Sequence, residues 1–257
     1  MISKNREKEQ KKEIRCLCMM LYLFCILNVM GVSVNLKNVE REYDNFHNEE
    51  AMETDAQPEK EPEEAEPEDT LSEKPKIALT FDDGPSDACT GKLLDGLKER
   101  NVKATFFVIG KNVKENPKLT KRICDEGHLI GNHTYSHIEM DKVTEEEAKK
   151  ELEAASNEVY ALTGKYPEYM RPPYGVCSRS LEDSLDMILV RWTIDPLDWK
   201  IENADKIVHK VVTQAQENDI ILLHDCYDSS VDAALRIIDI LQKKGFEFVT
   251  VDRLFLD

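Results

Sequence analysis

Two pairs of side chains in this sequence have the chemistry of acid–base catalysis or of metal binding. Asp82 and Asp83 follow an apolar run and precede a Gly-Pro turn in TFDDGP, and His133 and His137 lie four residues apart in HTYSH. Adjacent carboxylates repel each other, so the Asp pair favours a nearby cation or a role as a base, unless one Asp caps the next helix and the other is solvated. The His spacing predicts two imidazoles on one side of a helical turn, as a metal requires, although two unrelated surface histidines would show the same spacing.

Two histidines and one carboxylate, with coordination positions left for water, are typical of a catalytic metal centre. Such an ion polarises a carbonyl oxygen and lowers the pKa of water. A free carboxylate could then accept the proton of the water, and a second group must protonate the leaving group. His224, at the end of the apolar run DIILLH, is the candidate donor. A core histidine with a satisfied partner is the alternative, but the position at the end of the run, followed by Asp225, favours the functional interpretation.

A rigid segment, Arg171-Pro172-Pro173-Tyr174-Gly175, adds a cation to these candidates. Each proline fixes its own φ and biases the residue before it towards extended geometry. The segment could therefore hold Arg171 against a carboxylate and direct the Tyr174 backbone N–H into the site as a donor to an oxyanion. Taken alone, the segment is equally compatible with a loop that carries a surface arginine.

Short apolar runs alternate with amphipathic stretches along residues 76–257, which predicts an α/β fold with a parallel sheet. Seven runs without a Gly-rich phosphate loop after the first favour a barrel over a dinucleotide-binding sheet. In such barrels functional residues lie where strands end, and the candidates above, together with Asp195 to Trp199, fall at five strand ends. The predicted strands are 77–81, 104–110, 129–132, 169–174, 187–194, 219–224 and 246–251, and the predicted helices are 87–100, 112–126, 143–163, 178–185, 203–217 and 231–244.

Two of these helices carry further signals. Thr144 and Glu147 have the spacing of a capping box, and Gly164 stands where a C-cap would end the same helix. The apolar positions of the first and last helices have the spacing of a core-facing stripe. We interpret the following residues as core packing only: Leu93, Leu94, Leu97, Ile237, Ile238 and Leu241.

The first 75 residues differ sharply in composition from the rest. Residues 16–36 contain no charged side chain, and a helix of that length reaches roughly 30 Å, the thickness of a bilayer's hydrocarbon core. Basic residues precede this run and acidic residues follow it, which predicts a signal peptide or signal-anchor in residues 1–36 with the N-terminus in the cytoplasm. A buried core helix is the alternative. Small residues at 31–33 would allow cleavage, but the length of the run favours a retained anchor.

Residues 37–75 contain 15 acidic and 4 basic residues, which account for most of the chain's net charge of −17. We expect a disordered Glu/Pro-rich linker there and a catalytic domain over residues 76–257. No basic patch with interleaved aromatic residues suggests a nucleic-acid partner, and no obligate protein partner is evident. The cysteines at 89, 124, 177 and 226 contain no CxxC pair, so we expect mostly free thiols rather than a zinc cluster.

Taken together, the motifs resemble those of the polysaccharide deacetylase family (the NodB-homology domain, carbohydrate esterase family four). The resemblance covers residues 76–257 and includes five motifs in order: TFDDGP at 80–85, HTYSH at 133–137, RPPYG at 171–175, DPLDW at 195–199 and LLH at 222–224. It implies a distorted (β/α) barrel of about seven parallel strands that binds a divalent metal. Zn²⁺ is the expected ion, with Co²⁺ or another divalent ion as the alternative.

The resemblance also implies a role for each residue of the site. Asp83, His133 and His137 would be the metal ligands. Asp82 would be the general base, steadied by Arg171, and His224 the general acid, oriented by Asp198. The Tyr174 backbone N–H would contact the oxyanion, and the substrate-binding walls would be formed by Tyr174, Trp199, Leu222 and Pro173.

The resemblance implies metal-dependent hydrolytic removal of acetyl groups from an N-acetylated polysaccharide. The predicted anchor and acidic tether would hold the domain at the extracellular face of the membrane, which favours N-acetylglucosamine residues of peptidoglycan glycan strands as substrate. Partners would be that glycan and, through residues 16–36, the membrane; cleavage would release a secreted protein. A chitooligosaccharide deacetylase and an acetylxylan esterase are alternatives. A catalytically silent carbohydrate-binding domain would be expected to lack Asp82 or His224, and a phosphoesterase would require more basic residues.

Overall fold

Seven parallel strands form the centre of the fold, which a computed structural model describes for residues 74–255. The predicted signal segment (1–36) and nearly all of the predicted linker (37–75) lie outside the described residues. Among the helices of the described range, none is long and apolar enough to cross a membrane.

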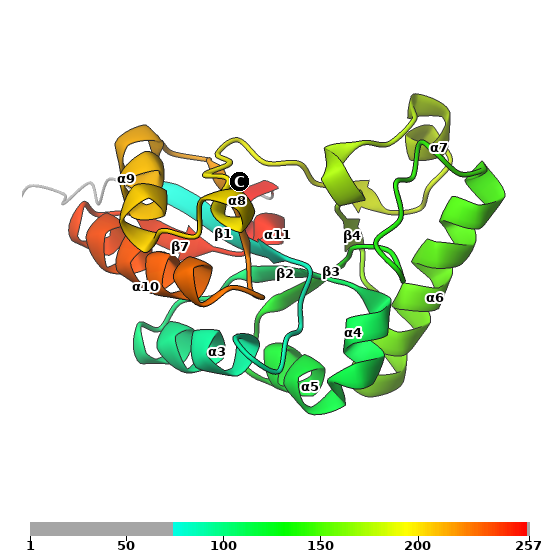
Figure 1. Cartoon of the computed structure of the whole chain (residues 1–257), viewed down its shortest axis with the longest axis horizontal. Coiled ribbons are helices and arrows are strands. Elements are labelled where there is room, and N and C mark those ends of the chain that lie inside the picture. The colour runs from blue at the N-terminus through cyan, green and yellow to red at the C-terminus, as the bar shows by residue number, and fades with distance from the viewer. Residues whose placement is uncertain (1–73, 256–257) are drawn as a thin grey trace, which may run out of the picture. The chain divides into compact units, whose positions relative to one another are not determined.

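The sheet is built around its first strand (Figure 1). One edge of β1 pairs with β6 along residues 78–82, while the other edge pairs with β7 at residues 76–78 and with β2 at residues 80–82. The order across the sheet is β5-β4-β3-β2-β1-β6, and β7 pairs with β1. The strands are β1 (Lys76–Asp82), β2 (Thr105–Val108), β3 (Leu129–Asn132), β4 (Tyr169–Met170), β5 (Ile188–Leu189), β6 (Ile220–His224) and β7 (Glu247–Val249).

The sheet curls into a distorted half-barrel, in agreement with the predicted fold class and strand number. Its closure is incomplete, because β5 and β6 do not pair in the described part of the chain. The segment after β5 meets β6 at one isolated bridge, between Ile194 and Ile221, and through hydrogen bonds between Thr193 and Ile220. Two predicted strands, 169–174 and 187–194, are reduced to two residues each. Pro172 and Pro173 lack the N–H that would continue β4. After β5, the carbonyls of Val190 and Arg191 accept hydrogen bonds from the Arg171 side chain instead of from a neighbouring strand.

Helices flank the sheet, and most of them match the predicted ranges (Figure 1). The predicted helix 112–126 is two helices, because Pro117 starts a new one at its first turn. Two short helices, α8 and α11, were not predicted. The helices are α3 (Thr90–Glu99), α4 (Gly110–Glu115), α5 (Pro117–Asp125), α6 (Glu145–Thr163), α7 (Arg179–Asp183), α8 (Asp198–Ile201), α9 (Ala204–Gln214), α10 (Asp228–Lys243) and α11 (Val251–Phe255), with a 3₁₀ turn η1 (Pro173–Gly175).

The ends of α6 confirm the predicted caps. The Glu147 backbone N–H donates to the Thr144 hydroxyl, and the Glu147 carboxylate accepts from the Thr144 backbone N–H, which completes the capping box. At the other end Gly164 has a φ of 72°, a left-handed conformation that glycine adopts without strain.

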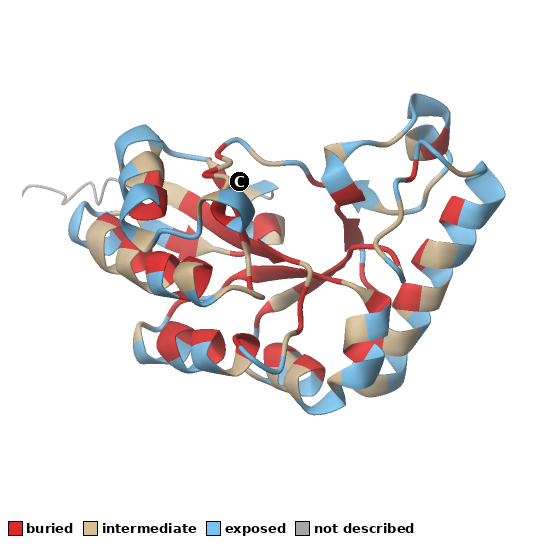
Figure 2. Cartoon of the chain, in the orientation of Figure 1, coloured by how far each residue is buried: buried red, intermediate tan, exposed pale blue. Residues whose placement is uncertain are grey.

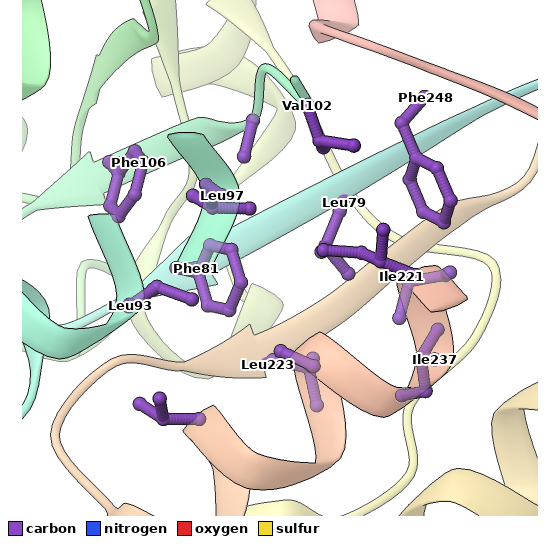
Figure 3. Packing of buried hydrophobic residues seen from close by; sticks show 14 of the residues in the cluster. Leu79, Phe81, Leu93, Leu97, Val102, Phe106, Ile221, Leu223, Ile237 and Phe248 are labelled. Atoms are coloured by element: carbon purple, nitrogen blue, oxygen red, sulfur yellow. The ribbon is translucent and has the colours of Figure 1, made fainter. Parts of the chain in front are cut away.

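The main core lies between β1, β2, β6 and the helices that cover them, α3, α9 and α10 (Figure 3). Buried residues follow the strands and the inner faces of the helices, while the outer faces are exposed (Figure 2). All of the apolar positions predicted as core on α3 and α10 are fully buried. Because these helices pack directly behind β1 and β6, they fix the strand ends that carry Asp82 and His224.

Replacing Ile237 by Ala is expected to lower the free energy of unfolding by about 2–5 kcal/mol, because it leaves a cavity in a fully buried part of the core. Ile240→Ala, on the same helix but only partly buried, provides a matched control and should have a smaller effect. Urea denaturation of both variants measures the difference. Equal losses of stability would contradict the assigned core.

Candidate active site

The candidate catalytic residues meet at the carboxyl ends of the strands, around a pocket of about 350 Å³. Asp82 is the last residue of β1, and His224 is the last residue of β6. These two residues are directly paired across the sheet, so the register of β1 and β6 sets their separation. The pocket is lined by Asp82, Asp83, His133, His137, Tyr174, Trp192, Asp195, Trp199, Leu222, His224 and Tyr227.

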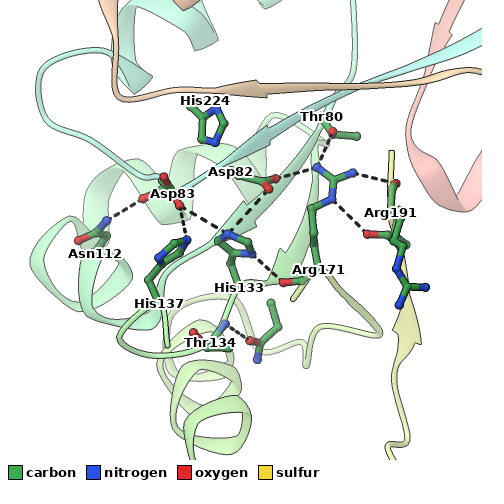
Figure 4. A network of polar contacts seen from close by, with 12 residues as sticks. Thr80, Asp82, Asp83, Asn112, His133, Thr134, His137, Arg171, Arg191 and His224 are labelled. Atoms are coloured by element: carbon green, nitrogen blue, oxygen red, sulfur yellow. Dashed lines mark hydrogen bonds and ion pairs between the residues drawn. The ribbon is translucent and has the colours of Figure 1, made fainter. Parts of the chain in front are cut away.

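Asp83, His133 and His137 form a cluster with the arrangement of a metal site (Figure 4). The Nε2 atom of His133 lies 3.5 Å from Asp83 Oδ1, and the Nε2 atom of His137 lies 3.3 Å from the same oxygen. Asp83 Oδ1 is buried and accepts no hydrogen bond from any residue that the structure describes. A buried carboxylate oxygen without a partner is costly, and a cation bound between it and the two imidazoles would satisfy all three groups. The residues present therefore fit a divalent ion.

The protonation states of this cluster suit metal binding, which requires neutral imidazoles and an ionised carboxylate. Burial lowers the pKa of His137 below its usual value. Burial would raise the pKa of Asp83, but the neighbouring imidazole of His133, with further charges of His224 and His137, lowers it. The His133 ring is oriented by a 2.7 Å hydrogen bond between Nδ1 and the Arg171 carbonyl oxygen, which leaves Nε2 facing the cluster.

The predicted helical turn at HTYSH is wrong, although the two imidazoles do converge. Thr134 and His137 have positive φ angles of 64° and 57°, so the segment is an irregular loop. The Thr134 N–H donates to the Asn132 side chain at 2.8 Å, and the Ser136 N–H donates to a Glu151 carboxylate oxygen at 2.7 Å. These side-chain acceptors replace the backbone carbonyls of a helix.

The backbone at Asp83 is also unusual, with a φ of 74° in the left-handed region that non-glycine residues rarely adopt. The Asn112 side-chain amide, from α4, donates to the Asp83 carbonyl oxygen at 2.7 Å and holds this conformation. Such strained backbone is concentrated at functional sites. Asn112 was not singled out from the sequence, where a polar residue in an amphipathic helix carries no distinguishing signal.

Asp82 is held by Arg171 in a fully buried ion pair (Figure 4). Arg171 Nη1 donates to Asp82 Oδ1 at 2.7 Å and to the Thr80 hydroxyl at 2.8 Å. The guanidinium carbon lies 4.2 Å from the ring centre of Phe107, a cation–π contact. Because Oδ1 is used by Arg171, the other carboxylate oxygen, Oδ2, faces the metal cluster, 3.8 Å from His133 Nε2. The prediction that Arg171 contacts a carboxylate is confirmed.

His224, at the end of β6, forms a hydrogen-bonded pair with Asp198. Asp198 Oδ1 lies 2.8 Å from His224 Nδ1, and Asp198 Oδ2 accepts the His224 backbone N–H at 2.8 Å. Burial alone would lower the pKa of His224, but the hydrogen bond and charge of Asp198, with smaller effects of Asp82 and Asp83, raise it to about 9. This pKa favours the charged imidazolium of His224 at neutral pH, and Nε2 lies outside the pairing with Asp198.

The walls of the pocket contain most of the predicted substrate-binding residues. Leu222 is buried beneath the pocket, whereas Tyr174 and Trp199 line it with 62% and 49% of their surfaces exposed. The Tyr174 ring packs edge-on against His137, with ring centres 4.9 Å apart. Pro173 is buried and, like Arg171 and Asp198, does not line the pocket.

Trp192 and Tyr227 line the pocket but were not predicted from the sequence. Trp192 packs so closely on Gly175 that a Cβ there would lie 2.7 Å from its ring. In the sequence, Trp192 sits inside an apolar run and Tyr227 precedes a helix, so both resemble ordinary packing residues. Only the folded arrangement places these two side chains beside the catalytic candidates.

Known proteins with similar sequence and structure act on acetylated glycans. Residues 70–188 match the sequence profile of the family described as polysaccharide deacetylase. The peptidoglycan-N-acetylglucosamine deacetylase PgdA of Listeria monocytogenes is 39% identical over 180 residues, which cover 70% of this chain and 39% of that relative. This chain therefore spans about two fifths of that relative's length.

A second relative is matched over most of its length. A peptidoglycan-N-acetylglucosamine deacetylase of Bacillus cereus is 42% identical over 192 residues, which cover 71% of this chain and 69% of that protein. Among solved structures, the peptidoglycan deacetylase PdaC of Bacillus subtilis has a TM-score of 0.69 at 40% identity, and the match covers 70% of this chain and 90% of that chain.

Proposed function

This chain belongs to the polysaccharide deacetylase family, and from that membership we propose that it removes acetyl groups from N-acetylglucosamine residues of peptidoglycan. The observation that carries the proposal is the arrangement of the pocket. A candidate metal cluster, a carboxylate with a free oxygen and a charged imidazole all border one cavity. Metal-dependent hydrolysis of an amide can use these three functions together, as Lewis acid, general base and general acid.

Asp83, His133 and His137 would hold the ion, and the chemistry it supplies is polarisation of the acetyl carbonyl and activation of water. Two imidazole nitrogens and one carboxylate oxygen suit Zn²⁺, with Co²⁺ or another divalent ion as the alternative. Asp82 would act as the general base, because its Oδ2 is free to accept a proton from the attacking water while Arg171 holds Oδ1. The buried guanidinium keeps this carboxylate in one orientation.

His224 would act as the general acid. Asp198 binds Nδ1, which leaves Nε2 to donate its proton to the departing amine nitrogen as the C–N bond breaks. The products are acetate and the free amine of the sugar. We assign Tyr174, through its backbone N–H, to the oxyanion, and the side chains of Leu222, Trp199 and Tyr174 to the wall around the acetyl methyl group. Pro173 would stabilise this wall, because its fixed φ restricts the backbone directly before Tyr174.

The residues that line the pocket support N-acetylglucosamine over N-acetylmuramic acid, which carries an additional lactyl carboxyl group. The lining contains no lysine or arginine that could pair with that carboxylate, and we assign the bound ion and His224 to the acetyl group and the departing amine. Arg171 is fully buried and already paired with Asp82, so it is not accessible to a second carboxylate. A sugar without its own charge fits these walls better.

The location of the protein is part of the same proposal. Residues 16–36 would anchor the chain in the membrane with its N-terminus in the cytoplasm, and residues 37–75 would extend the catalytic domain towards the cell wall on the extracellular side. Cleavage after the apolar run would instead release the domain. The partners are then the membrane and the glycan strands of peptidoglycan.

Acetate release from several purified substrates tests the substrate. We expect the full-length chain to release acetate fastest from peptidoglycan that carries acetyl groups on glucosamine only. Peptidoglycan acetylated only on muramic acid, chitooligosaccharides and acetylxylan serve as comparisons at equal acetyl concentration. A preference for the muramic acid substrate or for acetylxylan would overturn the assignment while leaving the family chemistry intact.

The pH dependence of kcat/KM should be bell-shaped. A general base must be ionised to accept a proton, which limits activity on the acid side, and on the alkaline side activity falls as His224 loses the proton that it must donate. The raised pKa of His224 keeps the acid form present as the pH rises towards about 9, and a bound cation would offset the part of this shift due to Asp82 and Asp83. The alkaline limb should therefore lie between pH 6.5, the unshifted value, and about 9.

Asp198→Asn provides the control for this assignment. Because it removes the negative charge that raises the pKa of His224, it should move the alkaline limb to lower pH while the acid limb stays in place. An alkaline limb at the same pH in both proteins would contradict the role of His224.

A further inference from the structure

A second pocket, of about 770 Å³, lies at the opposite end of the sheet from the active site. Leu129 and Tyr169, which line it, are the first residues of β3 and β4, so this pocket is at the amino ends of the strands. Its other walls come from the turn before β3, the end of α6 and the start of α11. None of the catalytic residues borders it.

His128 provides an unsatisfied hydrogen-bond donor in this second pocket. The residue is 7% exposed, and its Nδ1 accepts the Ala104 backbone N–H at 3.1 Å. Burial lowers its pKa to about 4, so the ring is neutral at neutral pH and carries its proton on Nε2. That Nε2 is buried and has no hydrogen-bond partner among the described residues. A buried donor of this kind is costly unless a bound molecule accepts its proton.

Asp252 provides an unsatisfied acceptor in the same pocket. Its Oδ1 is buried without a hydrogen-bond partner in the described part of the chain. The other carboxylate oxygen, Oδ2, lies 4.0 Å from the Arg253 side chain, outside the second pocket's lining. Two residues of the pocket lining therefore carry a buried polar atom without a partner, a donor on His128 and an acceptor on Asp252.

An aromatic side chain forms the rim. Tyr166 lines the second pocket with 56% of its surface exposed, and its ring stacks on Tyr160 with centres 4.3 Å apart and planes 11° from parallel. The stacking holds Tyr166 in a fixed orientation. Val159 and Ile130 contribute apolar surface deeper in the pocket.

We propose that this second pocket binds a sugar ring of the glycan, as a non-catalytic subsite. A pyranose has hydroxyl groups that both accept and donate, which match His128 and Asp252, and apolar C–H faces, which match Tyr166. Two acids, Glu168 and Asp252, against one base, Lys165, disfavour an anionic ligand. The choice of N-acetylglucosamine as the sugar rests on the proposed function. A second contact with the polymer would raise the local concentration of glycan at the enzyme.

Calorimetric titration with the tetramer of β-1,4-linked N-acetylglucosamine tests the proposal. The protein is the full-length chain carrying Asp82→Asn, which prevents hydrolysis during the titration. We expect two binding events. Tyr166→Ala should weaken one of them about tenfold, equivalent to about 1.4 kcal/mol, and should leave the other unchanged. We expect the same of Asp252→Asn, because it replaces a charged acceptor by the weaker, neutral oxygen of an amide. His209→Ala, which removes an exposed side chain that lines neither pocket, should change neither by more than about threefold.

Nuclear magnetic resonance of the same chain makes the test independent of these variants. Addition of the tetramer should shift the imidazole signals of His128, whereas those of His209, which lines neither pocket, should not move. A single binding event that is insensitive to Tyr166→Ala and Asp252→Asn, with His128 unshifted, would overturn the proposal. Tighter binding of the fully deacetylated tetramer at this pocket would overturn the assignment of an uncharged sugar.

Rates of acetate release distinguish a failure of this inference from a failure of the proposed function. In the chain with Asp82 intact, Tyr166→Ala and Asp252→Asn should slow acetate release from polymeric peptidoglycan several-fold and leave release from the tetramer unchanged. Equal rates on both substrates would overturn the role in polymer binding. Absence of acetate release from every substrate by the unmodified chain would contradict the proposed function instead.

Discussion

Replacing His133 by alanine is expected to remove both the bound divalent ion and the deacetylase activity. The candidate metal cluster has three ligand atoms, and His133 Nε2 is one of them, 3.5 Å from Asp83 Oδ1. Loss of a group that only orients a ligand typically weakens metal binding 10–100-fold, so loss of a ligand itself should exceed about 100-fold. Metal content after dialysis, measured by mass spectrometry, and acetate release together check this expectation.

His209→Ala is the matched control for this variant, since His209 lies on α9 and lines neither pocket. It should retain the metal and the full activity. Circular dichroism would establish that the His133 variant is folded, because its ring is buried and also contacts the Arg171 carbonyl. A folded His133→Ala protein with a full complement of metal would contradict the proposed ligand set.

Replacing Asp82 by asparagine should separate catalysis from metal binding. Asn keeps an oxygen that can accept the hydrogen bond of Arg171, but it cannot accept a proton from water. The turnover number should therefore fall by about 10²–10⁴, the usual contribution of a general base, while the metal content stays at the unmodified level. Acetate release and metal analysis on the same sample measure both quantities.

Two further measurements are needed to interpret this second prediction. The variant leaves the buried Arg171 charge without an anionic partner, which can destabilise a protein by about 3–5 kcal/mol, so its unfolding should be measured alongside. Asp195→Asn removes another carboxylate that lines the same pocket and should reduce turnover less than tenfold. Metal loss in Asp82→Asn as large as in His133→Ala would refute the division of roles between base and ligand.

The sequence predicted the strand ends well because the motifs coincide with strong local signals. Apolar, β-rich runs directly precede Asp82 and His224, and the structure places these residues at the ends of β1 and β6. The parallel register then brings them together without further information. Residue types predicted a metal site of two histidines and one carboxylate, the resemblance to the family selected Asp83 as that carboxylate, and the structure brings Asp83, His133 and His137 together.

Features that depend on side chains distant in the sequence could not be predicted in the same way. The loop at HTYSH is set by acceptors on Asn132 and Glu151 rather than by the helical spacing of its histidines. The shortness of β5 results from Arg171, which binds the carbonyls that a strand would use. The second pocket arises where a turn, a helix end and the C-terminal helix meet, so no single segment carries its pattern.

The most direct test of the central claim is acetate release from N-acetylated peptidoglycan by the full-length chain, measured before chelation, after chelation and after Zn²⁺ is restored. We expect release by the untreated protein, loss of nearly all release with the chelator, and recovery when Zn²⁺ or Co²⁺ is added back. Acetate release that continues at the same rate after the metal is shown to be absent would contradict a metal-dependent deacetylase.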